Sequence, residues 1–134
     1  MKQQIIDALR AFIAARPGLE FGNYGDVSSY RAEMRGITRD LNDARTLLRA
    51  VEWRGVTAEA LLEAARGSRL TINADATLDY CTGQYYPTEY RRAVAAICAR
   101  ALWDHWRSPA TTGDTLRTTA RREFGRGLAG RYFA

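Results

Sequence analysis

The strongest helical signal in the chain lies at residues 87–107, which read PTEYRRAVAAICARALWDHWR. Pro87 has the fixed backbone torsion of a first helical turn, and Glu89 places a negative charge near the positive end of the helix dipole. Apolar side chains then recur at the spacing of one helix face. This face is formed by Tyr90, Ala93, Val94, Ile97, Cys98, Ala101 and Leu102. The segment is therefore predicted to be the central element of the core.

Four shorter helices are predicted before this segment. Their ranges are 3–16, 28–35, 39–54 and 58–66. Gly36 is expected to cause a break or a bend between the second and the third, because glycine weakens a helix interior. Gly55 and Gly67 stand where left-handed caps would end the third and fourth, and Thr57 is suited to cap the start of the fourth. The N-terminal half is thus expected to be helical apart from a glycine-rich loop at residues 18–26.

The remaining segments complete the predicted bundle. Residues 68–86 alternate weakly, so they form either a small β-hairpin or an irregular segment packed on the helices. A last helix begins at Asp114 as N-cap, and its apolar side chains recur every four residues. These side chains are Leu116, Ala120, Phe124 and Leu128. We predict an all-α fold, with residues 1–134 forming a single domain of five or six helices.

Composition excludes several classes of protein. The 134 residues are 46% hydrophobic and 26% charged, which is typical of a globular protein rather than a disordered or fibrous one. No apolar run approaches the roughly 20 residues that span a bilayer. Residues 1–16 lack the continuous apolar stretch of a signal peptide, and the two cysteines are widely spaced. A soluble cytoplasmic protein with reduced thiols is expected.

Positive charge is concentrated near the end of the sequence. The chain carries a net charge of +5, and residues 107–134 supply +4 of it through six arginines and two acids. Four of these arginines flank the apolar stripe of the last predicted helix: Arg117, Arg121, Arg122 and Arg126. Such a flank is either a solvated helix face or a contact surface for nucleic acid or an acidic protein. The acids Asp40 and Asp43 share one helix face and are expected to be solvated.

A tyrosine-rich segment is the strongest candidate surface for a protein partner. Tyrosine and arginine are enriched where interfaces concentrate binding energy. The candidate residues are Tyr80, Gln84, Tyr85, Tyr86, Arg91 and Arg92. The same residue types also stack on single-stranded bases, and some of these rings could instead fill the core. A protein interface at this segment is the leading interpretation.

Catalytic and metal-binding motifs are not recognisable. Cys81, Cys98 and His105 provide too few ligands at the wrong spacing for zinc, and nothing in the sequence pairs Cys81 with His105 as nucleophile and base. There is no phosphate-binding glycine loop. We therefore expect neither an enzyme nor a bound metal or cofactor.

Two stretches of the chain resemble small uncharacterised proteins of bacterial phages and integrative elements. They are residues 78–92, LDYCTGQYYPTEYRR, and residues 120–128, ARREFGRGL. The resemblance implies an accessory protein that binds a host macromolecule, as anti-defence proteins do. The leading hypothesis is a non-enzymatic protein that binds and blocks a host protein or complex. The alternative is a basic nucleic-acid-binding module that uses the arginine-rich last helix.

Overall fold

The computed structural model of the chain describes residues 1–14, 27–80 and 87–134. Within these ranges the chain forms six helices and one antiparallel pair of short strands, which confirms the predicted all-α bundle and shows a β-hairpin between residues 68 and 86. In chain order the elements are α1 (Lys2–Ala14), α2 (Val27–Trp53), α3 (Ala58–Ala65), β1 (Leu70–Ile72), β2 (Leu78–Tyr80), α4 (Pro87–Trp106), α5 (Gly113–Phe124) and α6 (Arg126–Tyr132).

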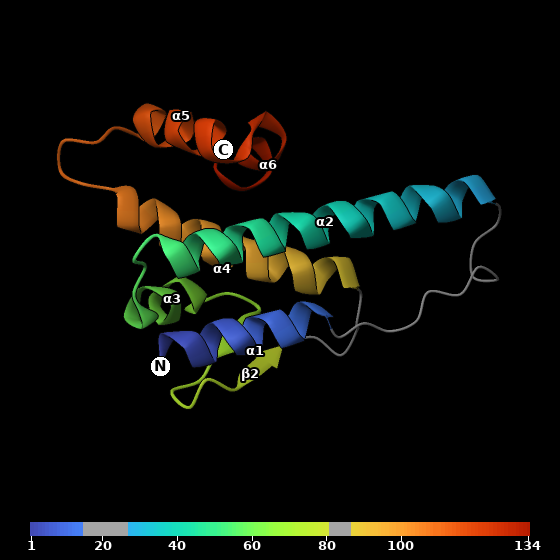
Figure 1. The fold of residues 1–134 in the computed structure, drawn as a ribbon, viewed down its shortest axis with the longest axis horizontal. Helices are drawn as coiled ribbons and strands as arrows, with labels where there is room; N and C mark the ends of the chain where they lie inside the picture. The colour runs from blue at the N-terminus through green and yellow to red at the C-terminus, as the bar shows by residue number, and fades with distance from the viewer. Residues whose placement is uncertain (15–26, 81–86) are drawn as a thin grey trace.

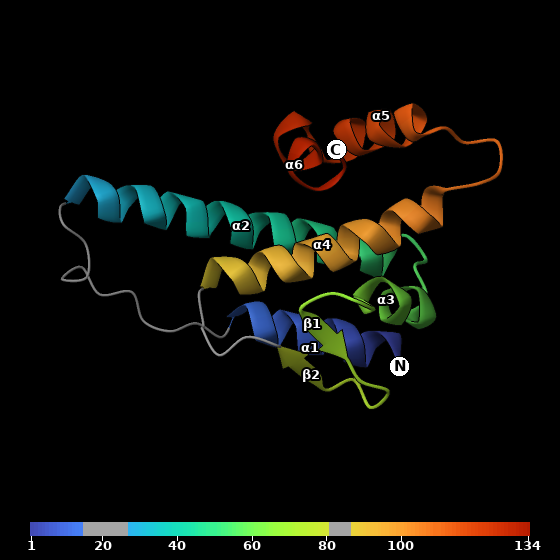
Figure 2. The same cartoon turned by 180° about the vertical axis from the view of Figure 1, so that it is seen from behind.

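Helices α2 and α4 lie side by side through the middle of the molecule (Figure 1 and Figure 2). Helices α1 and α3 and the hairpin lie on one side of this pair, and α5 and α6 lie on the other. Helix α4 contacts α1, α2, α3 and α6. The segment at residues 87–107 is therefore the central element, as its apolar face predicted.

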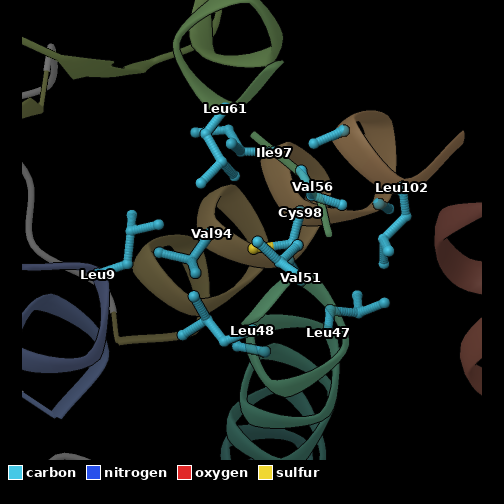
Figure 3. Packing of buried hydrophobic residues seen from close by; sticks show 14 of the residues in the cluster. Leu9, Leu47, Leu48, Val51, Val56, Leu61, Val94, Ile97, Cys98 and Leu102 are labelled. Atoms are coloured by element: carbon cyan, nitrogen blue, oxygen red, sulfur yellow. The ribbon is translucent and has the colours of Figure 1, made fainter. Parts of the chain in front are cut away.

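The core forms where α4 meets α2, α3 and α1. Figure 3 shows side chains from all four helices in this cluster: Leu9, Leu47, Leu48, Val51, Leu61, Val94, Ile97, Cys98 and Leu102. Each of them is almost fully buried. Burying one large aliphatic side chain contributes about 1.5–3 kcal/mol before conformational entropy is counted. This cluster is the main source of stability for the described part of the chain.

Helix α2 is continuous, which corrects the predicted break at Gly36. The structure joins the predicted helices 28–35 and 39–54 into one helix from Val27 to Trp53. Gly36 weakens a helix by about 1 kcal/mol relative to alanine. The buried residues that follow it, Ile37 and Asp40 among them, hold the helix against its neighbours. Tertiary packing therefore outweighs the local cost of the glycine.

Replacing Gly36 with alanine should raise the free energy of unfolding by about 0.5–1 kcal/mol. An added Cβ would meet no atom within 4 Å, so the substitution gains helix propensity without a clash. Urea unfolding followed by circular dichroism measures the change. Gly55→Ala is the contrasting variant, because φ at Gly55 is +76° and alanine is strained there. A less stable Gly36→Ala protein would contradict a continuous α2.

The hairpin is stabilised by its packing and its turn. Leu70 pairs with Tyr80 and Ile72 with Leu78, and both β1 residues are buried against the core. At the turn, the Asn73 side-chain amide donates to the Asp79 carboxylate at 2.9 Å. Two isolated strands would be marginal in water, so contact with the helices is what stabilises them.

Candidate functional site

Helices α5 and α6 border an open hollow of about 750 Å³. All four arginines predicted on the flank of the last helix line it, Arg117, Arg121 and Arg122 from α5 and Arg126 from α6. The other lining residues are Thr118, Ala129, Gly130, Phe133 and Ala134. Among the described residues, no acidic side chain lines this hollow. We call it the arginine groove.

Local sequence determines where these two helices begin and end. The Thr112 hydroxyl accepts from the Thr115 backbone N–H at 3.2 Å, so Thr112 is the N-cap of α5 and the predicted cap at Asp114 is wrong by two residues. Gly125 ends α5 and precedes α6 with φ +88° and ψ 162°. Residues with a Cβ rarely adopt this backbone conformation. The glycine thus allows the turn that brings Arg126 alongside the arginines of α5.

The predicted apolar stripe holds α5 and α6 onto the bundle. Leu116, Ala120 and Leu128 are buried. The Phe133 ring lies almost parallel to the Phe124 ring, with 5.8 Å between their centroids, and also stacks on Trp106 of α4. With these side chains facing inward, the arginines of the groove are left at the surface.

The arginines of the groove differ in their partners. Arg117 donates to the Asp114 carboxylate at 3.0 Å, and its guanidinium lies 5.9 Å from the centroid of the Trp103 ring. Three others, Arg121, Arg122 and Arg126, are exposed and form no ion pair with any carboxylate in the described part of the chain. The neighbouring Glu123 is paired with Arg54 at the end of α2. Three positive charges are therefore open to an external anion.

A buried carboxylate on α2 anchors α6. Arg131 donates two parallel hydrogen bonds to Asp43, at 2.7 and 2.9 Å, and Asp43 is only 6% exposed. This contact raises the pKa of the Arg131 guanidinium, chiefly through the hydrogen bond. Burial, together with the charges of Asp40 and Asp43, raises the pKa of Tyr132 to about 12. The anchor is therefore an ion pair beside a phenol that stays neutral at neutral pH.

The expectation that Asp40 and Asp43 are solvated is wrong. Asp40 is fully buried and accepts from Arg92 at 3.0 Å and from Arg39 at 3.2 Å. Both acids lie on the side of α2 that faces the bundle. Buried carboxylates are tolerated when they are paired and hydrogen-bonded, and these arginines provide that pairing.

The described residues of the tyrosine-rich candidate site lie partly in the core and partly at the molecular surface. Tyr80 is half-buried, and its ring centroid lies 5.0 Å from that of Tyr90 and 6.0 Å from that of Phe12. Its hydroxyl donates to the Glu89 carboxylate at 3.2 Å. Gln84, Tyr85 and Tyr86 lie outside the described residues. Tyr80 therefore belongs to an aromatic cluster between α1, β2 and α4.

The side chains of Arg91 and Arg92 lie in different environments, Arg91 in the core and Arg92 at the surface. The Arg91 side chain is 1% exposed and donates to the backbone carbonyls of Ile13 at 3.4 Å and Ile37 at 3.0 Å. Arg92 is exposed and bonds to the buried Asp40. Arg91 thus lies inside the fold instead of on the predicted binding surface, because it faces α1 and α2 from the buried side of α4.

Of the two cysteines, the structure describes Cys98. Cys98 is completely buried, and burial raises the pKa of its thiol to about 12, so it packs as a small apolar side chain (Figure 3). Cys81 lies outside the described residues. Within the described ranges no group of three or more His, Cys, Asp or Glu side chains is placed to hold a metal ion.

Comparisons with protein-family models, curated proteins and solved structures gave no match. In the described ranges, no helix is both long enough and apolar enough to cross a bilayer.

Sequence reasoning found the four arginines of the groove but missed the residues that shape and anchor it. Phe133 lines the groove while stacking on two other rings. Asp43 anchors Arg131 across 88 positions of sequence. Local periodicity gives no signal for a pair that distant, because it reports only neighbours within a few turns.

Proposed function

We propose that the arginine groove binds the phosphate backbone of nucleic acid. One observation carries this proposal: arginines from two helices surround a single hollow that no described acidic side chain lines. Three of these guanidinium groups have no carboxylate partner among the described residues. Guanidinium groups form paired, charge-assisted hydrogen bonds with phosphate oxygens, which suits this arrangement.

This function predicts a steep dependence of affinity on salt. Each phosphate neutralised by a cation contributes about −0.9 to the slope of log K against log salt on a duplex, and about −0.7 on a single strand. Four neutralised phosphates would lower affinity by about 50- to 150-fold between 50 and 200 mM salt. The groove is proposed to recognise backbone charge, because its lining offers few groups that distinguish bases.

The test replaces both Arg121 and Arg122 with alanine. Both side chains are exposed and unpaired with any described carboxylate, and alanine is a strong helix former, so α5 should remain folded. We expect weaker binding of a short oligonucleotide at low salt and a salt slope smaller by about 1.4–1.8. Fluorescence anisotropy with labelled single-stranded and duplex probes measures both quantities.

A matched control removes two positive charges elsewhere. Arg66 and Arg69 are exposed residues between α3 and β1, so Arg66→Ala/Arg69→Ala changes the net charge equally. The control should bind almost as tightly as the unchanged protein. Equal losses in both variants would show a general charge effect. Absence of binding at low salt would eliminate the proposal.

A protein partner at residues 80–92 is the second proposal. A hollow of about 410 Å³ adjoins this segment, and its lining includes Arg69, Tyr80, Glu89 and Arg92. Mixed charge beside an aromatic ring suits a protein surface, and occupying it would block that partner sterically. The variant Tyr85→Ala/Tyr86→Ala should lose capture of a host protein while melting at an unchanged temperature. Loss of folding instead would assign these rings to the core.

A further inference from the structure

Two acids and four arginines of α2 lie on different sides of the helix. Asp40 and Asp43 are buried against the bundle, and Glu52 is paired with Arg10 of α1. Four arginines are exposed at intervals that place them along the outer face: Arg31, Arg35, Arg45 and Arg49. None of the four forms an ion pair with a described carboxylate. The helix therefore carries a stripe of four exposed arginines, none of them paired with a carboxylate that the structure describes.

Part of this stripe borders a hollow. Arg45 and Arg49 of α2 and Arg10 of α1 line a space of about 330 Å³ between the two helices. The other lining residues are Ile13, Ala14 and Leu48. Arg10 is already paired with Glu52, so Arg45 and Arg49 supply the guanidinium groups of this hollow that have no partner among the described carboxylates, and the rest of its lining is apolar. An anion with an attached uncharged body, such as a phosphate on its sugar, fits this chemistry.

A tryptophan lies at the end of the same face. Trp53 is 79% exposed and follows Arg49 by one helical turn. Every other described tryptophan or phenylalanine is at least partly buried, as is each described tyrosine side chain. A large exposed ring beside a line of arginines combines stacking with phosphate binding, the two interactions by which proteins hold single-stranded nucleic acid.

We infer that the outer face of α2 binds single-stranded nucleic acid, with its arginines on the backbone phosphates and Trp53 stacked on a base. From Arg31 to Trp53 the helix rises about 33 Å, enough to follow several nucleotides. A single strand is favoured over a duplex because stacking needs a base face that is not already covered by its neighbours. This surface uses none of the residues of the arginine groove, so separate variants test the two surfaces.

The first test is Trp53→Ala, measured on a single-stranded oligothymidylate probe of about 20 nucleotides. We expect affinity to fall by about 5- to 150-fold, the range for losing one stacked base. Trp53→Phe should retain most of the affinity, because it keeps an aromatic face. Tryptophan fluorescence should be quenched by the probe in the unchanged protein, and most of this quenching should disappear in Trp53→Phe.

The second test is Arg45→Ala/Arg49→Ala on the same probe. The salt slope should decrease by about 1.4, because each phosphate that an arginine no longer neutralises removes about 0.7 from it. Arg66→Ala/Arg69→Ala is the charge-matched control, and its slope should not change. Equal effects in test and control would overturn the inference. Unaltered binding by Trp53→Ala would also overturn it, as would a change only in oligomeric state, which sedimentation would detect.

Parallel measurement of Arg121→Ala/Arg122→Ala separates the two surfaces. Affinity that is unchanged in this variant but lower in Trp53→Ala would support binding at the α2 surface and contradict binding at the groove. The reverse result would support binding at the arginine groove and contradict binding at the α2 surface. Weaker binding by both variants would mean that one strand spans both surfaces, which supports both proposals.

Discussion

Replacing Arg91 with alanine is expected to lower the free energy of unfolding by about 3–5 kcal/mol. Its guanidinium is buried and bonds to carbonyls of two other helices, Ile13 in α1 and Ile37 in α2. The Ile13 carbonyl lies in the last turn of α1, where carbonyls have no partner within the helix. The substitution would therefore leave a cavity and remove a hydrogen-bond donor that links three helices.

Urea unfolding of Arg91→Ala measures this loss. Arg91→Met keeps most of the side-chain volume without the donors, so its smaller loss, about 1–3 kcal/mol, reports the cost of removing the buried hydrogen-bond donors. The control is Arg100→Ala in the same helix, whose exposed side chain pairs with Asp104 on the surface and contributes little. An Arg91→Ala protein as stable as Arg100→Ala would contradict the structural role.

Replacing Asp43 with alanine is expected to release α6 from α2. The carboxylate accepts two hydrogen bonds from Arg131, and no other ion pair among the described residues joins these helices. Removing one member of a largely buried pair costs about 3–5 kcal/mol when the remaining charge stays buried. Arg131 is partly exposed and can turn to water, so we expect a loss of about 2–3 kcal/mol, concentrated in α6.

Hydrogen exchange at the amides of residues 128–133 should detect this release. These amides should exchange faster in Asp43→Ala, while those of the α2–α4 core change little. A double-mutant cycle with Arg131→Ala gives the coupling energy, and Asp114→Ala provides a surface control, because Asp114 is almost fully exposed. Unchanged exchange in α6 would show that packing of Phe133 holds the helix without the ion pair.

The Asp43 variant also connects the anchor to the proposed function. Arg126 and Phe133 line the arginine groove from α6 and its end, so release of α6 should widen the groove and weaken oligonucleotide binding. The arginines of α5 remain in place. The loss of affinity should therefore be smaller than that of Arg121→Ala/Arg122→Ala.

The arginine flank that lines the groove was predictable because its signal is local. Arg117 and Arg121 are one turn apart beside the apolar residues Leu116 and Ala120, and that periodicity fixes which side faces water. The burial of Arg91 could also have been predicted from the sequence. It lies one turn before Val94 and two turns before Cys98, so it shares their buried face. Arg91 was predicted to be exposed because arginine is usually found at the surface. Its position in the helical repeat instead indicated the buried face.

Sequence alone determined the positions of most helical segments, the caps at Gly55 and Gly67, and the basic flank of the last helix, because each follows from interactions within a few residues. Tertiary structure alone decided that α2 continues through Gly36 and that Asp40 and Asp43 are buried. Their arginine partners, Arg92 and Arg131, lie 52 and 88 positions away. Only folding brings such pairs together, and this pairing leaves the outer face of α2 positive.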